Sequence, residues 1–271
     1  MDNWDNLSSK TIMWKKPTYI GVWGQQAKEH AENIQDIEDY QISLLGTPRF
    51  MSYFENRNRE LCSHFKFNYI LFVGTALNFD EEFVLSEIDK VLENNREIWG
   101  DIRLIYRPHP WRQNECEVLD SYGDNIITDP QILVAHDDKS TRIQPDLDYY
   151  PSLISNAEFV MGGLTSMLIE SLIFYKQFLA LVHEDKKYVT NMRNAWKNFE
   201  HFRGLRGVEG VYFSKDINDL ESRMIDCWKN RDTINLSKME SDRNYYLYED
   251  GLGYQQRLNT IVEKILHQVD I

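Results

Sequence analysis

The sequence has few cysteines, and they lie far apart. Cys62, Cys116 and Cys227 are the only three in 271 residues. Their odd number and wide spacing exclude a disulfide framework and match no metal-ligand pattern. We therefore expect free thiols in a reducing environment, and with them a cytoplasmic protein.

Long apolar runs are also lacking. The longest, residues 172–182, is interrupted by Lys176 and Gln177, and it falls well short of the roughly 20 apolar residues that span a bilayer. The opening MDNWDNLSSK has neither the basic nor the apolar region of a signal peptide. We expect neither a membrane span nor a secretion signal, and we find no internal repeat.

Basic residues are outnumbered. Lysine and arginine total 30 against 43 acidic residues, which gives a formal charge of −13 and a pI near 5.0. An acidic surface argues against nucleic-acid binding, which depends on basic patches. It does not argue against binding one nucleotide, which needs only a local cluster of donors. Hydrophobic residues at 42% and aromatics at 13% are enough for a large core.

Strands and helices alternate from residue 68 onward. Residues 69–73 form a continuous apolar run, typical of a strand buried on both faces of a parallel sheet. Such alternation implies right-handed crossovers and a Rossmann-like α/β domain, with a parallel sheet and helices on both faces. The other expected strands are 102–106, 126–127, 132–135, 157–161, 178–182 and 211–213, and the expected helices are 80–94, 146–156, 164–175, 188–199 and 216–228.

The first 66 residues predict a connector rather than a complete domain. We expect strands at 19–24 and 42–45, a helix at 25–37, and an interdomain hinge or loop at 46–50. The domain with the main sheet is placed at 67–240, and residues 241–271 are expected to be a helical tail. Its last helix is amphipathic through Leu258, Ile261, Val262, Ile265, Leu266 and Val269, and four tyrosines are expected to pack against it, namely Tyr245, Tyr246, Tyr248 and Tyr254.

A strand-turn-helix unit at 157–182 predicts a phosphate-binding site. Gly162 and Gly163 leave room for a ligand near the backbone, and the helix that follows begins with the hydroxyls of Thr165 and Ser166. Glu170 lies in the following helix near the same turn, where its carboxylate could accept hydrogen bonds from ribose hydroxyls. The alternative is an ordinary buried turn in which the hydroxyls only cap the helix.

Two further loops should meet this turn. Gly74 and Thr75 follow one strand, and Arg107 and His109 follow the next. Ligands of open parallel sheets lie beyond the carboxyl ends of the strands, so we expect all three loops at one rim. Prolines on both sides of His109 would hold its imidazole beside a phosphate. Alternatively, His109 is a plain loop histidine and Arg107 a surface ion-pair partner.

Together these motifs resemble a known family. RPHP at 107–110, followed by DYYPSLISNAEFVMGGLTSMLIESL at 148–172, resembles the donor-nucleotide half of GT-B-fold transferases that build bacterial surface polysaccharides. Relatives in this sense are capsule and lipopolysaccharide transferases, CDP-glycerol glycerophosphotransferases and bacterial sialyltransferases. The resemblance assigns the donor's phosphates to Arg107, His109, Thr165 and Ser166, and the ribose to Glu170. Gly74, Thr75, Gly162 and Gly163 complete the expected donor site.

The first part of the chain resembles the same proteins. DNWDNLSSK, VWG and GTPRF are similar to the end of an acceptor domain and its connection, so residues 1–66 are expected to be a connector and acceptor-domain remnant. The resemblance implies two Rossmann-like domains, and this chain has room for one. The catalytic base is therefore expected in a missing amino-terminal half, and Asp2 and Asp5 are interpreted as solvated connector residues.

The implied function is glycosyl transfer from a nucleotide-activated donor, CMP- or CDP-linked rather than UDP-linked, to a polysaccharide or glycolipid acceptor. Regions outside this chain are expected to add any peripheral association with the inner membrane. No cofactor and no metal are expected, although residues 136–138 (His-Asp-Asp) offer an alternative cation site. Three alternatives stay open: transfer of glycerol phosphate from CDP-glycerol, a non-hydrolysing UDP-sugar epimerase, and a non-catalytic nucleotide-binding or interaction module.

Overall fold

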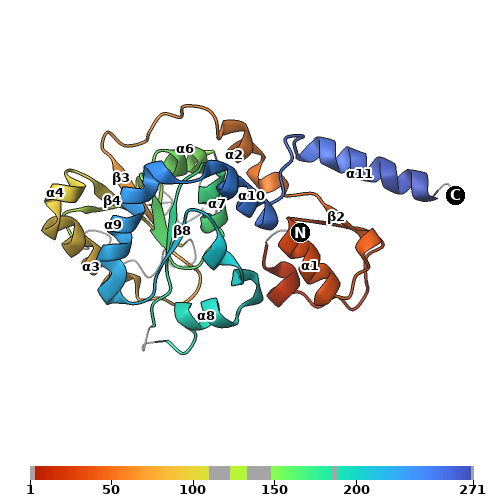
Figure 1. The fold of residues 1–271 in the computed structure, drawn as a ribbon, viewed down its shortest axis with the longest axis horizontal. Helices are drawn as coiled ribbons and strands as arrows, with labels where there is room; N and C mark the ends of the chain where they lie inside the picture. Colours follow the sequence, from red (N-terminus) through yellow and green to blue (C-terminus); the bar gives the residue numbers. More distant parts are fainter. Residues whose placement is uncertain (1–3, 110–122, 133–147, 185–187, 270–271) are drawn as a thin grey trace.

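A computed structural model describes residues 4–109, 123–132, 148–184 and 188–269. Its centre is a six-stranded sheet in the order β5-β4-β3-β6-β7-β8, in which every neighbouring pair is parallel (Figure 1). The strands are β3 (Tyr69–Val73), β4 (Arg103–Arg107), β5 (Ile126–Thr128), β6 (Val160–Gly162), β7 (Phe178–Leu181) and β8 (Val211–Ser214). The predicted α/β Rossmann-like class is confirmed.

The strand order fixes where a ligand would lie. From β3 the chain runs outward through β4 to β5, then returns to the other side of β3 and continues through β6 and β7 to β8. Because right-handed crossovers in opposite directions put their helices on opposite faces, α3 (Glu81–Asn94) and α7 (Met167–Ile173) cover different faces. The direction reverses between β3 and β6, and the crevice beyond such a switch point is the usual ligand position.

The sequence explains these elements. All five residues of β3 are buried, as expected for a central parallel strand. Asp80 caps α3 by accepting a hydrogen bond from the Phe83 amide, and Val84 and Ile88 face the core. Further helices around this sheet in the described residues include α4 (Arg96–Trp99), α6 (Tyr149–Ser155), α8 (Met192–Asn198), α9 (Leu220–Asn230) and α10 (Leu236–Tyr246), with short turns η5 (Glu200–Phe202), η6 (Leu205–Gly207), η7 (Ile217–Asp219) and η8 (Arg231–Thr233).

The first residues form a second, smaller sheet. β1 (Ile20–Val22) and β2 (Ile42–Leu44) pair in parallel and are joined through α1 (Gln25–Asn33) and η2 (Asp39–Gln41), after the single π-helical turn η1 (Asn6–Lys10). The helix predicted over 25–37 ends at Asn33, and the chain turns away through Asp36, which has a left-handed φ of 54°. Ile34, expected on the apolar face, is 45% exposed. The expected hinge at 46–50 contains the short helix η3 (Pro48–Phe50), which continues into α2 (Met51–Asn56).

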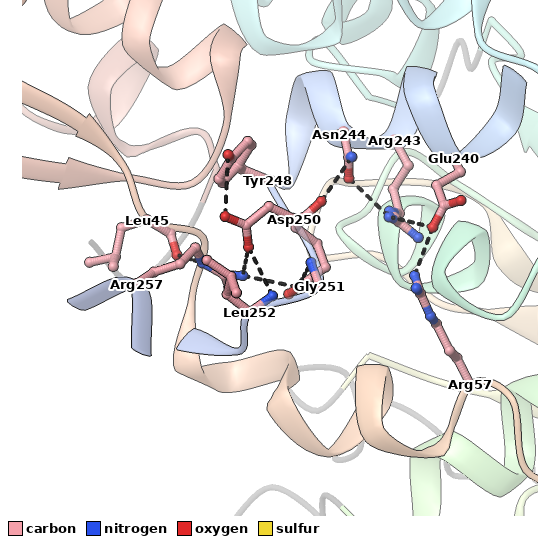
Figure 2. Close-up of polar contacts among 11 residues, drawn as sticks. Leu45, Arg57, Glu240, Arg243, Asn244, Tyr248, Asp250, Gly251, Leu252 and Arg257 are labelled. Atoms are coloured by element: carbon pink, nitrogen blue, oxygen red, sulfur yellow. Dashed lines mark hydrogen bonds and ion pairs between the residues drawn. The ribbon is translucent and has the colours of Figure 1, made fainter. Parts of the chain in front are cut away.

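The end of the chain returns to this small sheet. α10, which was not predicted, contains the expected boundary at residue 240 and packs on α7 and α1. The Tyr248 amide donates to the Trp23 carbonyl (2.7 Å). Arg257 donates from Nε to the Leu45 carbonyl (3.0 Å) and from Nη1 to Glu249 and Asp250 (2.9 Å each) (Figure 2). Residues 241–257 are therefore tied to β1 and β2.

The last helix, α11 (Tyr254–Val269), extends away from the rest of the molecule (Figure 1). The helix predicted from Leu258 to Val269 is confirmed and begins earlier, at Tyr254, but Val262 is 44% and Leu266 58% exposed. The expected tyrosine packing is found only in part: the Tyr248 ring lies 5.9 Å from the guanidinium carbon of Arg257 in α11, but Tyr246 meets Trp4, with ring centroids 5.9 Å apart. Within the described ranges, no helix combines the length and apolarity needed to cross a bilayer.

Candidate functional site

Three loops meet at the switch point, as their positions in the sequence predict. The Gly74 amide, just after β3, donates to the Arg107 carbonyl at the end of β4 (2.8 Å). A Cβ on Gly74 would lie 2.5 Å from the His109 amide nitrogen, so these two loops touch. The Thr75 hydroxyl donates to the Leu164 carbonyl after β6 (3.1 Å). His109 and the turn after Gly162 therefore belong to one rim.

The two glycines after β6 serve packing inside the protein. Gly162 has a φ of 152°, and a Cβ there would lie 2.1 Å from the Val73 carbonyl oxygen. A Cβ on Gly163 would lie 2.7 Å from Cγ2 of Thr75. The space that the missing side chains leave is thus filled by β3 and its loop. This corrects the expectation that the pair makes room for a ligand.

Thr75 is a buried tie rather than an open donor. It is 1% exposed, its hydroxyl is used by Leu164, and its amide donates to Glu81 Oε1 (3.1 Å). The other oxygen of Glu81 accepts from the Tyr106 hydroxyl (2.7 Å). Glu81 therefore clamps the loops after β3 and β4. In the sequence it was one of several acids in a first helical turn, and nothing distinguished it.

Arg107 is not available to a phosphate in this structure. Its side chain is 4% exposed and forms a buried ion pair with Asp129, which follows β5. Its Nη2 also donates to Gln131 (3.0 Å) and to the Tyr150 hydroxyl (2.9 Å). The predicted phosphate contact and the alternative surface pair are both replaced by a buried clamp between β4, β5 and α6.

Glu170 is buried as well, with a 1% exposed side chain, so it does not face a ribose. Its Oε2 accepts from the Tyr53 hydroxyl (3.1 Å), and its Oε1 accepts from the Ser166 hydroxyl (3.2 Å). Arg49 Nη2 lies 3.6 Å from Oε1. Burial raises the pKa of the Glu170 carboxyl above its ordinary value, although Arg49, Tyr53 and Ser166 oppose the shift. The sequence did not point to Arg49, because residues 46–50 were interpreted as a hinge, or to Tyr53, because no element was predicted for α2 (Met51–Asn56).

Three half-buried residues lie at the rim, namely His109, Thr165 and Ser166. Thr165 Oγ1 accepts a long hydrogen bond from the Met167 amide (3.5 Å), whereas Ser166, at the N-cap position of α7, makes no side-chain capping hydrogen bond. The imidazole and the Thr165 hydroxyl have N–H and O–H groups suited to an anion, and the Ser166 hydroxyl would first have to leave Glu170.

Two cavities lie elsewhere on the molecule. One of about 230 Å³ opens beyond β7 and β8, with His183 and Phe79 in its wall, and one of about 240 Å³ lies between α2 and the start of α11. None of the predicted site residues lines either cavity. Within the described residues, no group of three metal-ligating side chains is found, and the alternative cation site at 136–138 falls outside them.

Comparisons with known proteins find similarity at the level of the fold. No protein-family model matches the chain, and no curated protein matches its sequence. Solved structures do match. The wall teichoic acid polymerase TagF aligns with a TM-score of 0.56 at 13% identity, covering 97% of this chain and 66% of that one. Its H444N variant with CDPG gives 0.54 at 14%, covering 94% and 58%.

A putative UDP-N-acetylglucosamine 2-epimerase from Listeria monocytogenes aligns with a TM-score of 0.57 at 13% identity, covering 92% of this chain and 60% of that one. The chain has a GT-B-like fold. It spans about 58–66% of the length of these solved chains. The TM-scores support the shared fold, but identities of 13–14% do not show that this chain has the activity of either protein.

Proposed function

We propose that this chain binds the nucleotide-activated donor of a GT-B-type glycosyltransferase in surface polysaccharide or lipopolysaccharide synthesis. One observation carries the proposal: His109 and the hydroxyls of Thr165 and Ser166 lie on one rim at the switch point between β3 and β6. This is where open parallel sheets bind nucleotides. The formal net charge of −13 disfavours binding of a nucleic acid but permits binding of one small ligand.

In this proposal the rim holds the donor's phosphates while an acceptor hydroxyl attacks the donor carbon. The bond from that carbon to the phosphate oxygen breaks, and negative charge develops on the departing nucleotide. His109 donates a hydrogen bond to that oxygen, and Thr165 donates to a neighbouring phosphate oxygen. Ser166 does the same once its hydroxyl turns away from Glu170 Oε1, to which it donates in this structure. A CMP- or CDP-linked donor is preferred over a UDP-linked one, and the acceptor is a polysaccharide or glycolipid.

A second candidate is glycerol-phosphate transfer from CDP-glycerol. The fold similarity to a teichoic acid polymerase variant with CDPG favours it. The similarity to a putative epimerase keeps a UDP-sugar epimerase as a further alternative. A non-catalytic module is the outcome if no nucleotide binds.

Thermal unfolding with CMP, CDP, UDP, GDP or ADP tests the proposal. One nucleotide should raise the melting temperature of the full chain, and His109→Ala and Thr165→Ala should each lose that rise. His267→Ala and Thr260→Ala on the exposed face of α11 are matched controls and should keep it. Indifference of the wild-type chain to every nucleotide would leave only the interaction module.

A further inference from the structure

We propose that Arg49, from the segment before α2, supplies the cation that contacts the donor's phosphate. The inference rests on the proposed function and extends the same site. A diphosphate carries more charge than one imidazole and two hydroxyls neutralise, so the rim requires a cation. Arg107, which the sequence offers for this role, is occupied by Asp129 in the interior.

Arg49 lies beside the rim hydroxyls. Its Nη2 is 3.6 Å from Glu170 Oε1, and the Ser166 hydroxyl donates to that same oxygen (3.2 Å). Two groups that approach one oxygen are neighbours. Ser166 in turn directly follows Thr165 and precedes α7, so the guanidinium is next to the turn proposed to hold the phosphates.

The guanidinium is also available. The Arg49 side chain is 34% exposed, against 4% for Arg107. At 3.6 Å its pairing with Glu170 is too long for a hydrogen bond, and among the described residues its guanidinium forms none. Five N–H donors in a planar fork therefore remain for a phosphate group.

The position of Arg49 is fixed by its neighbours. Its amide donates to Thr47 Oγ1 (3.3 Å), and its guanidinium carbon lies 5.3 Å from the centre of the Phe50 ring. Phe50 packs on Tyr53 (5.1 Å between ring centres), and Tyr53 packs on Phe174 at the end of α7 (5.6 Å). A cation on such a preorganised segment loses little conformational entropy when it binds a ligand.

Glu170 is then a positioning residue. It holds Arg49 through charge and Tyr53 through a hydrogen bond, without facing the ligand itself. One consequence is that residues 47–53, which link the two sheets, are part of the donor site. Donor binding should therefore strengthen the contact between this segment and α7.

The test is isothermal titration of the full chain with CDP, cytidine and inorganic pyrophosphate. Arg49→Gln removes the charge and Arg49→Lys keeps it without the fork. Arg57→Gln is the matched control, since Arg57 pairs with Glu240 (3.0 Å), away from the rim (Figure 2). We expect Arg49→Gln to weaken CDP binding by about tenfold or more, with Arg49→Lys intermediate and Arg57→Gln unchanged.

The outcomes separate the inference from the function. If the Arg49→Gln variant binds CDP as tightly as the Arg57→Gln variant, the inference is wrong, but the proposed donor site is not affected. An equal loss for cytidine and CDP has the same consequence, because a phosphate contact must affect CDP more. If the wild-type chain binds pyrophosphate through Arg49 but no nucleotide, Arg49 is a phosphate ligand and the proposed donor function fails. If it binds none of the three probes, both fail.

Discussion

The Tyr53 hydroxyl donates a hydrogen bond of 3.1 Å to the Glu170 carboxylate, across 117 residues of sequence. Both side chains are buried, and they join the segment between the two sheets to the helix that follows β6.

Tyr53→Phe should destabilise the chain by about 1–3 kcal/mol, because it leaves one oxygen of a buried carboxyl without its donor. Chemical denaturation at neutral pH measures the change in the free energy of unfolding. Tyr40→Phe is the control, since Tyr40 is 74% exposed. If both variants unfold at the same denaturant concentration as the wild type, the contact contributes nothing to stability.

Glu170→Gln should change how stability depends on pH. The folded-state pKa of Glu170 lies above its ordinary 4.5, so the folded chain binds this proton more tightly than the unfolded chain. The stabilisation that Glu170 gives the folded chain by binding this proton is fully present below pH 4.5 and is lost as pH rises through the folded-state pKa. Denaturation curves at successive pH values above 4.5 should therefore show the variant gaining stability relative to the wild type. A constant difference would contradict the raised pKa.

His183 should act in the opposite direction. Burial lowers its pKa to about 4, and Asp219 and Asp216 only partly offset this. The unfolded chain binds the His183 proton more tightly than the folded chain does. The stabilisation that neutral His183 gives the folded chain is therefore fully present above pH 6.5 and is lost as pH falls towards 4. The loss is on the order of 3 kcal/mol. We expect His183→Gln to flatten the fall in stability over this range. An unchanged slope in that variant would mean that His183 does not cause it.

Gly162→Ala should destabilise the sheet by about 2–4 kcal/mol, through backbone strain and collision with the Val73 carbonyl. Gly207→Ala is the matched control, because a Cβ there meets nothing within 4 Å. Thermal unfolding of both variants measures the contrast. Equal melting temperatures would show that β3 and β6 can separate without cost.

Arg107→Met should cost about 3–5 kcal/mol, since it removes the cation partner of the buried Asp129 carboxyl. Arg223→Met removes an exposed pair with Asp226 and should change stability by less than about 1 kcal/mol. Urea denaturation compares them. A small effect at Arg107 would return it to the candidate phosphate ligands.

The sequence was most informative where one local signal decided the structure. The continuous apolar run at 69–73 predicts β3, and Asp80 before an amphipathic stretch predicts α3. The meeting of three loops follows from parallel topology alone. α10 was missed because its apolar residues do not gather on one face, and its burial comes from contacts with α7 and α1.

The site was harder to predict because burial is a tertiary property. Arg107 and Glu170 have side chains suited to a nucleotide, and nothing local shows that Asp129 and Tyr53 occupy them. Arg49 was overlooked for the converse reason: it lies far from the predicted turn in sequence and beside it in space.

The packing of residues 47–53 on α7 also decides how the chain can be shortened. A fragment that begins at residue 67, just before β3, would keep the whole six-stranded sheet. It would lack Tyr53 and Arg49, which contact Glu170, and it would expose Phe174 to water. The smallest piece able to fold by itself should therefore start ahead of Thr47.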